Sequence, residues 1–575
     1  MGSTRGYVVP PRYWAWLGRP GVLLAGCWLV ALGVGVHHLR HARAWLVAGP
    51  DTPTALRRPD PAGHGHTQVD FGGQWVMARM LVTGRGRELY HRQRQWEVVR
   101  AGFPVADETP AQREESIVPA TRRELARSSD DVGHDADRMM GWFMGGDPPA
   151  WKTVGGAAAA PLAAAFADPF TAVALEAAAA AAVTPAVVAA VETPAVGGPL
   201  YPPVHAFFYA PLGLFPRPHD AYALFQVVAL GAAALAGLGI SRLTGGRVWW
   251  PVATVAVLLY PGCRSALELG QNPTFSLCVL VWGWVLAARG RDAAGGMVWG
   301  LLAFKPVWGL AFFLVPLLTR RWRFCAAMVG TGAGLAAATL PVVGVQAWLD
   351  WLDIGKQAAG VYNQSTNWIA LSRDLQGLPR RYLLDLSPQT VEDTPLARRW
   401  GWGLWGFVFG ATVLTYALRG DRRRAVGLGA GFLFLGAFLT CYRFMYYDVL
   451  LSAVAVAVLL AEPGRLLRTR TFTLSDPTTP ALDREMTSPA AVADPLGPRA
   501  VGYVNSFALT VLLALYLHDN VLLGLNARAT LGLGGSADTP LSLDTSLTYP
   551  WDTALLLVLW AGSGLRLLAR GERSS

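Results

Sequence analysis

The sequence has almost no lysine. Only Lys152, Lys305 and Lys356 occur in 575 residues, so arginine carries nearly all of the positive charge behind the formal net charge of +10. Charged residues make up 15% of the chain, whereas a soluble globular protein has about 25%. The arginines gather in short segments such as 320–323 and 422–424, which is typical of the cytoplasmic loops of membrane proteins. The basic charge therefore does not indicate a nucleic-acid partner.

The sequence also lacks paired cysteines and the common nucleotide and hydrolase motifs. Its five cysteines lie singly in or beside apolar segments without a CxxC spacing, which argues against a disulfide framework and a zinc site. No Walker loop, GxGxxG after a strand, GxSxG or HExxH occurs. These absences argue against an ATPase, a dinucleotide enzyme, a serine hydrolase of the elbow type and a zinc protease. The sequence indicates no cofactor and no metal.

What the sequence has instead is long apolar runs. Hydrophobic residues make up 53% of the chain and the mean hydropathy is +0.32, and many runs reach the ~17–25 residues that cross a bilayer as a helix. We predict an all-α polytopic integral membrane protein with about 10–12 membrane helices. The expected helices are 21–36, 204–216, 220–240, 248–262, 273–289, 294–319, 324–345, 401–419, 424–440, 445–461, 502–518 and 551–568.

Composition divides the chain into five parts. They are a basic N-terminal segment with an uncleaved first helix (1–37), a long external segment that is partly of low complexity (38–200), a membrane core with an external loop at 346–400 (201–461), a flexible cytoplasmic linker rich in Pro, Thr, Asp and Arg (462–500), and the C-terminal helices (501–575). We expect the first helix to remain uncleaved, because no small-residue cleavage site follows the first apolar run, and we expect its basic N-terminus in the cytoplasm. The linker composition cannot bury enough apolar surface to fold.

Two runs complicate the count of crossings. The 204–216 run is short, and we expect it to be re-entrant. The 294–319 run contains Lys305-Pro306 midway, where a helix should break, so it either crosses twice or dips in and returns. With this orientation the basic loops are cytoplasmic, and several polar loops share the external face with Asp70.

Asp70 stands among aromatics and glycines in the segment Val69-Asp70-Phe71-Gly72-Gly73-Gln74-Trp75. One interpretation is a general base that removes a proton from an acceptor hydroxyl, since a carboxylate near a dry membrane cleft can have a raised proton affinity. The other is an exposed carboxylate that caps a helix starting near Gly72. Position alone favours the cap.

Lys305 is the single lysine inside an apolar run of the sequence. A lysine there needs an anionic partner or a route to the membrane interface. A lipid phosphate would serve as that partner, and so would an acidic residue of another helix such as Glu268. The two interpretations are equally favoured.

Other polar residues lie at the ends of apolar runs. Tyr201 and His205 line a substrate cleft in one interpretation and form a plain helix entrance with a packed histidine in the other, which is the more common case. Gln271 and Asn272 suit hydrogen bonds to sugar hydroxyls, and Asn272 equally suits a helix N-cap. The two roles of Asn272 are compatible.

The second half of the core contains four more candidates. Asn363 belongs to a polar patch that follows the tryptophan-rich stretch 348–353, which suits a membrane interface. Arg373 could bind a phosphate through two hydrogen bonds or be solvated in a loop. Arg443 and Asp448 pair with one another in one interpretation, and in the other Arg443 meets a phosphate.

Taken together, these segments resemble glycosyltransferase family 87 of the C-type membrane glycosyltransferases, which includes polyprenol-phosphate-mannose-dependent α-mannosyltransferases. The resemblance covers roughly residues 20–90 and 200–460, and the insertion between Tyr90 and Tyr201 and the 462–500 linker depart from the family. The matching segments are Asp70-Phe71, Gly84, Leu89-Tyr90, Tyr201-Pro202-Pro203, Pro211, Gly270-Gln271-Asn272, Gly300, Lys305-Pro306, Arg320-Arg321-Trp322, Asn363-Gln364-Ser365 and Tyr447-Asp448.

The resemblance implies an inverting transfer of a hexose, with mannose as the first candidate, from a polyprenyl-phosphate donor to a lipid or glycan acceptor. It implies a cleft at the external membrane face, which we place in a bacterial plasma membrane, and it makes Asp70 the expected catalytic base. The expected phosphate-binding residues are Lys305, Arg373 and Arg443, and the expected sugar or acceptor contacts are Tyr201, His205, Gln271, Asn272, Asn363 and Asp448.

Three alternatives remain open from the sequence. A transporter or flippase of a lipid-linked sugar would need the cationic cleft without Asp70 as a base, although no internal repeat is visible. A membrane scaffold with polar loops would leave Lys305 without a use. A glycan ligase or polymerase would take a diphosphate-linked oligosaccharide instead.

Overall fold

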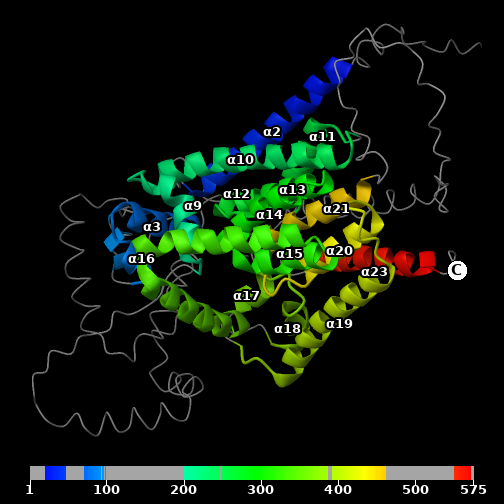
Figure 1. Ribbon diagram of the computed structural model, residues 1–575. Coiled ribbons are helices and arrows are strands. Elements are labelled where there is room, and N and C mark those ends of the chain that lie inside the picture. Colours follow the sequence, from blue (N-terminus) through cyan, green and yellow to red (C-terminus); the bar gives the residue numbers. More distant parts are fainter. Residues whose placement is uncertain are drawn as a thin grey trace, which may run out of the picture. The chain divides into compact units, whose positions relative to one another are not determined.

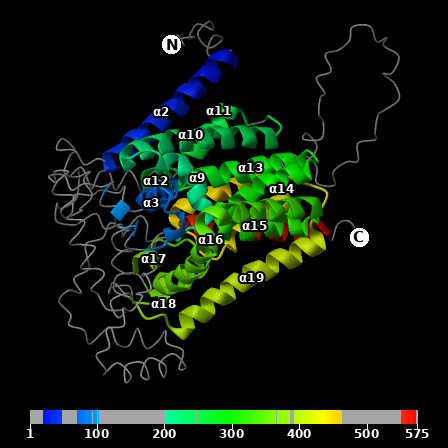
Figure 2. The same ribbon diagram turned by 60° about the vertical axis from the view of Figure 1, so that its left-hand side comes forward.

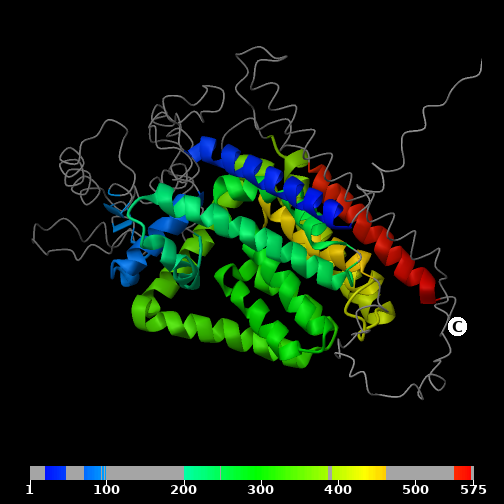
Figure 3. The same ribbon diagram turned by 90° about the horizontal axis from the view of Figure 1, so that it is seen from above.

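The computed structural model (Figures 1, 2 and 3) describes residues 20–46, 70–91, 200–246, 248–364, 366–385, 391–461 and 550–571, with a few positions between 94 and 101. The insertion after Tyr90, the 462–500 linker and the expected helix 502–518 lie outside the described residues. The chain clusters into two compact units. Unit 1 comprises residues 1–43, 225–337 and 362–575, and unit 2 comprises residues 44–224 and 338–361.

The described part of the chain is helical, with an isolated β-bridge between Ser372 and Met445 and no strand. Among the residues that the structure describes, five helices are long and apolar enough to cross a membrane, or six if a bent pair is one span. The long helices are α2 (Pro20–Leu46), α10 (Pro218–Leu243), α16 (Trp322–Gln364), α19 (Pro395–Arg419) and α23 (Trp551–Gly571). The bent pair is α11 (Trp250–Leu258) and α12 (Cys263–Leu269), at an angle of 64°.

These helices confirm the prediction of an all-α polytopic membrane protein. The described residues also form shorter apolar helices, namely α13 (Pro273–Ala288), α14 (Asp292–Gly300) with η5 (Leu301–Phe304), α15 (Pro306–Leu318), α20 (Leu428–Leu439) and η6 (Tyr446–Ser452) with α21 (Ala453–Leu460). How many of these short helices cross the bilayer is not fixed by their length. The count of ten to twelve crossings therefore stays a prediction.

In unit 1, α13 and α14 lie side by side as a hairpin (Figures 1 and 2). Glycines let them come close: a Cβ atom on Gly283 would lie 2.2 Å from the Trp299 ring, and one on Gly295 would lie 2.6 Å from the Gly283 carbonyl oxygen. Small residues at the contact are the usual means by which membrane helices approach one another. The close approach lets Trp284 and Trp299 stack, with ring centroids 5.8 Å apart.

The centre of unit 1 is α20, which packs against α15, α19, α21 and α23. Its sequence is apolar all round, and all but one of its residues are buried. A helix without a polar face is expected to be enclosed by other helices. The apolar sequence of residues 428–439 therefore explains why this helix lies at the centre of the unit.

The break predicted at Lys305-Pro306 is confirmed. The chain passes from η5 to α15 through Lys305, whose φ of −138° and ψ of 74° are not helical. Proline disfavours the helical conformation of the residue before it and has no N–H to donate. This break places the Lys305 side chain at the N-terminus of α15.

The segment expected as a loop at 346–400 is largely helical. The first long helix of this region does not end at 345, because α16 continues to Gln364 after a kink at Gly344, which has φ 75°. Helices α17 (Thr366–Leu371) and α18 (Gly377–Leu383) follow, and α19 begins at Pro395 rather than at 401. Glycine tolerates the positive φ that changes the helix direction.

Unit 2 is built on the contact between α3 (Asp70–Val82) and α9 (Pro203–Gly213). Trp75 Nε1 donates to the Phe215 carbonyl oxygen at 3.1 Å, and Arg79 donates to that of Gly213 at 3.0 Å. A Cβ atom on Gly213 would lie 2.4 Å from the Ala78 backbone, so only glycine fits there. At 11 residues, α9 spans about 16 Å, roughly half of a bilayer core.

We predict that Gly213→Ala destabilises the protein by about 1–3 kcal/mol, the usual cost of overpacking, because the added methyl would collide with the α3 backbone. The matched control is Gly231→Ala in α10, where a Cβ atom meets nothing within 4 Å. That control should be neutral or stabilising. Thermal unfolding of both variants in detergent checks the prediction, and equal midpoints for the two would contradict the described contact.

Candidate functional site

Lys305 and Asp448 form a buried ion pair in unit 1. Lys305 Nζ donates to Asp448 Oδ1 at 2.7 Å, and the two side chains are 13% and 3% exposed. The ring of Tyr447 lies beside the ammonium, with its centroid 5.6 Å from Nζ. The acidic residue expected as its partner, Glu268, instead forms an ion pair with Arg264 at 2.6 Å. The acidic partner of Lys305 in the structure is therefore Asp448.

A backbone N–H group three residues earlier holds the Asp448 carboxylate. Its Oδ2 accepts a hydrogen bond from the Met445 N–H at 3.3 Å, at the start of η6. The carboxylate is therefore fixed in place while its other oxygen receives the lysine. This gives the buried ion pair the extra hydrogen bond that such pairs need to repay the loss of hydration.

The ammonium of Lys305 has N–H groups that donate to no described residue. It carries three N–H groups, and one of them is used within the described part of the chain, for Asp448. Lys305 also stands at the N-terminus of α15, where the helix dipole favours a negative charge. A fixed ammonium with unused donors at such a helix end suits an anionic ligand group.

Arg443 and Asn363 meet elsewhere in unit 1. An Nη atom of Arg443 donates to the Asn363 side-chain oxygen, and the guanidinium lies 5.7 Å from the centroid of the Tyr442 ring. The interpretation that Arg443 pairs with Asp448 is wrong, because Asp448 is bound to Lys305. The structure thus joins two predicted site residues that lie 80 positions apart.

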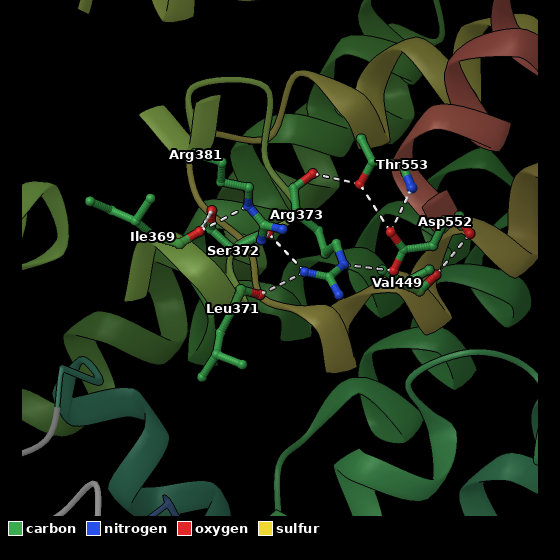
Figure 4. A network of polar contacts seen from close by, with 9 residues as sticks. Ile369, Leu371, Ser372, Arg373, Arg381, Val449, Asp552 and Thr553 are labelled. Carbon is green, nitrogen blue, oxygen red and sulfur yellow. Dashed lines mark hydrogen bonds and ion pairs between the residues drawn. The ribbon is translucent and has the colours of Figure 1, made fainter. Parts of the chain in front are cut away.

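Arg373 is the centre of a buried network (Figure 4). Its Nε donates to Asp552 of α23 at 2.8 Å, with side chains 2% and 7% exposed, and Nη1 donates to the Ser372 carbonyl oxygen at 3.1 Å. The Thr553 hydroxyl donates to the Arg373 carbonyl oxygen at 2.9 Å. These contacts tie the segment after α17 to the last helix, which is a structural role, and the solvated-loop interpretation of Arg373 is wrong.

A second guanidinium lies next to this network. Arg381 donates to the carbonyl oxygens of Ile369 and Ser372, as Figure 4 shows. Burial, and then the charge of Arg373, lower the pKa of Arg381 to about 9, while Asp552 and Asp374 act in the opposite direction. Arg381 thus remains a cation at neutral pH.

Gln271 and Asn272 are both 1% exposed, at the turn between α12 and α13. Asn272 occupies the N-cap position of α13, but its side chain makes no capping hydrogen bond. Its amide nitrogen and oxygen have no hydrogen-bond partner among the described residues. Because an unpaired buried amide is costly, this side chain is suited to a polar ligand group.

The aromatic residues of the second predicted motif stack along α9 in unit 2. The ring of His205 lies between those of Tyr201 and Tyr209, with centroid distances of 3.9 Å and 4.5 Å. His205 is fully buried, as the packed-histidine interpretation predicted. The Tyr90 hydroxyl donates to the Tyr201 carbonyl oxygen at 2.6 Å, so the segment around Tyr90 fixes the start of this stack.

Asp70 is the first residue of α3, two positions before the helix start expected near Gly72. Its side chain lies outside the described residues, so its role stays a prediction. The residue after it, Phe71, is fully buried and its ring makes an edge contact with Tyr222. Within the described part of the chain, no group of three or more His, Cys, Asp or Glu residues could hold a metal ion.

Sequence reasoning missed the partners of the predicted cations. Lys305 and Asp448 are 143 positions apart, and Arg373 and Asp552 are 179 apart. No spacing rule connects residues so distant in the chain. Asp552 opens the last apolar run, and a charge at that place was the one available signal.

Comparison with known proteins gives one match. Residues 200–442 match the family described as glycosyltransferase family 87. The matched range includes Tyr201, Gln271, Asn272 and Lys305, and it excludes Asp70 and Asp448. Searches of curated proteins and of solved structures gave no match.

We predict that Lys305→Met and Asp448→Leu each destabilise the protein by about 3–5 kcal/mol, because each leaves one buried charge unpaired. The double variant should lose much less than the sum of the two. Thermal unfolding of the four proteins in detergent forms the cycle that checks this. Strictly additive losses would show that the two side chains do not interact.

Proposed function

Because the chain belongs to glycosyltransferase family 87 and is a membrane glycosyltransferase, we propose that it transfers a hexose, with mannose as the first candidate, from a polyprenyl-phosphate donor. The acceptor is a hydroxyl group of a lipid or glycan. The reaction takes place at the external face of a bacterial plasma membrane. Within this proposal the lipid tail of the donor stays in the bilayer and the phosphate meets the protein.

The observation that carries the proposal is the Lys305 ammonium. It is fixed by Asp448 at 2.7 Å, it is largely buried, and it keeps N–H donors at the N-terminus of α15. A phosphate is the anion that such a site favours. Arg443, which already contacts Asn363, is the second candidate for the donor phosphate, and Asn272 is a candidate for the sugar hydroxyls.

The proposed reaction inverts the anomeric carbon. Asp70 takes the proton of the acceptor hydroxyl, whose oxygen attacks the anomeric carbon opposite the phosphate. A bond forms between that oxygen and the anomeric carbon while the bond from carbon to phosphate oxygen breaks, and the electron pair leaves with the lipid phosphate. The departing phosphate is an anion of low basicity and needs no acid, so one carboxylate suffices where a glycosidase uses two. Positive side chains stabilise the charge that develops on it.

The sequence suggested Arg373 as a phosphate-binding residue, and in this proposal it has a supporting role instead. Its hydrogen bonds to Asp552 and to backbone oxygens hold the chain together. We therefore assign it to the support of the 372–376 segment, which carries the β-bridge from Ser372 to Met445 and so borders η6.

We predict that Asp70→Asn lowers sugar transfer by about 10²–10⁴-fold, the usual contribution of a general base. The measurement is transfer from radiolabelled polyprenyl-phosphate-mannose in membranes with matched expression. Asp353→Asn is the control, because Asp353 is 60% exposed and its only ion pair within the described chain is with Lys356. Transfer that survives in Asp70→Asn would remove Asp70 from the chemistry and leave the transferase standing. Absence of transfer by the wild type would contradict this donor, and movement of the labelled lipid across the bilayer would then favour a flippase.

We also predict that Lys305→Met lowers kcat/KM for the donor by about 10–100-fold, because a phosphate contact is lost. Lys356→Met is the matched control: it removes the same charge from a side chain that is 79% exposed. Lys305→Arg keeps the charge and should fall between the wild type and Lys305→Met. The loss should grow with the charge of the leaving group, so a diphosphate-linked donor serves as a second probe. Equal kcat/KM in Lys305→Met and Lys356→Met would exclude Lys305 from donor binding.

A further inference from the structure

Asp350 occupies an inward position of an amphipathic helical segment in unit 2. After the kink at Gly344, the exposed apolar residues of α16 are Val345, Leu349 and Leu352, at 64%, 49% and 51%. The buried positions are Ala347 at 0%, Asp350 at 5% and Ile354 at 4%. These three follow the i, i+3, i+7 spacing of a buried helical stripe. An apolar residue is expected at the middle position, and a carboxylate stands there.

This carboxylate has no cationic partner among the described residues. Its Oδ1 accepts a hydrogen bond from Gln346 Nε2 at 2.8 Å, one turn earlier in the helix. The nearest lysine in the sequence, Lys356, is bound to Asp353 on the exposed side at 2.9 Å. Burying a carboxylate without a cation costs free energy. A ligand that donates hydrogen bonds would offset that cost.

The surroundings of Asp350 belong to the second predicted motif. Trp351 donates through its indole N–H to the Leu200 carbonyl oxygen at 3.1 Å, which joins this part of α16 to the residue before Tyr201. The fully buried Tyr90, whose hydroxyl binds the Tyr201 carbonyl oxygen, has a pKa raised well above its usual value by burial first and then by the charge of Asp350. Asp350 therefore lies close to the segment that positions the aromatic stack of α9.

The chemistry of the site selects its ligand class. A lone carboxylate repels a phosphate, so the donor's phosphate is disfavoured here. Within the described part of the chain, no group of three or more His, Cys, Asp or Glu side chains could hold a metal ion here. A carboxylate oxygen accepts hydrogen bonds from hydroxyl groups. A sugar carries several hydroxyl groups and therefore suits this carboxylate.

We propose that Asp350 binds a hydroxyl group of the sugar-bearing acceptor, which makes it a residue of the acceptor site in unit 2. The inference rests on the proposed glycosyl transfer. It assigns Asp350 to binding and leaves the proton transfer to Asp70.

The test compares Asp350→Asn with Asp353→Asn, which removes the same charge one turn further along the same helix, from an exposed position. Transfer is measured from polyprenyl-phosphate-mannose to octyl α-mannoside as the acceptor probe. We expect the acceptor KM of Asp350→Asn to rise about tenfold or more while its donor KM changes less than about twofold, and Asp353→Asn to match the wild type. A change in kcat alone, or an equal rise of both KM values, would overturn the proposal.

A binding measurement and a second variant complete the test. Binding of radiolabelled octyl α-mannoside to protein in nanodiscs, corrected for empty nanodiscs, needs no turnover. It should be lost in Asp350→Asn and kept in Asp70→Asn, even if the donor is another lipid and the wild type transfers no mannose. Equal binding by the wild type and Asp350→Asn, or no saturable binding by the wild type, would overturn the proposal.

If Asp350→Asn does not accumulate, Asp350→Glu takes its place. The carboxylate is kept and moved by one methylene, so the acceptor KM should rise by about threefold or more with the donor KM unchanged. Unchanged acceptor KM in Asp350→Glu would overturn the proposal.

Discussion

The buried ion pair between Lys305 and Asp448 is the constraint on which the candidate donor site depends. Lysine can be kept inside an apolar core only if a carboxylate compensates its charge, and Asp448 does so from a segment that is fixed by its own backbone hydrogen bond. The ion pair forms only when the junction between η5 and α15, which carries Lys305, lies beside η6, which carries Asp448. The helix break at Pro306 is what lets the ammonium leave the apolar surface of the helix and reach that carboxylate.

The same principle operates at Arg373, with a different result. There Asp552 and two backbone carbonyl groups surround the guanidinium, and the pair joins the segment after α17 to the last helix. A cation that is enclosed in this way supports the fold, whereas Lys305 keeps N–H donors for a ligand. Two cations that look alike in the sequence thus differ in how many of their donors the protein itself consumes.

Buried carboxylates meet three kinds of partner among the described residues. In unit 1 Asp448 and Asp552 each meet a cation, whereas Asp374 accepts hydrogen bonds from the backbone N–H groups of Gln376 and Gly377. In unit 2 the buried Asp350 meets an amide instead, among the described residues. A phosphate is favoured beside a cation and a sugar hydroxyl beside a carboxylate without one, which is why we propose Lys305 for the donor phosphate and Asp350 for an acceptor hydroxyl.

The sequence by itself determined the helical membrane class, the break at Lys305-Pro306 and the family resemblance, because apolar period, proline chemistry and short motifs are local properties. It also pointed to the polar residues at helix ends. Only the tertiary structure decided that Asp448 rather than Glu268 compensates Lys305, that Arg443 meets Asn363, and that Asp350 faces inward. These outcomes depend on contacts between residues tens to hundreds of positions apart, and on the direction that α16 takes after Gly344. No pattern within one helix specifies them, since each depends on which helices pack against which.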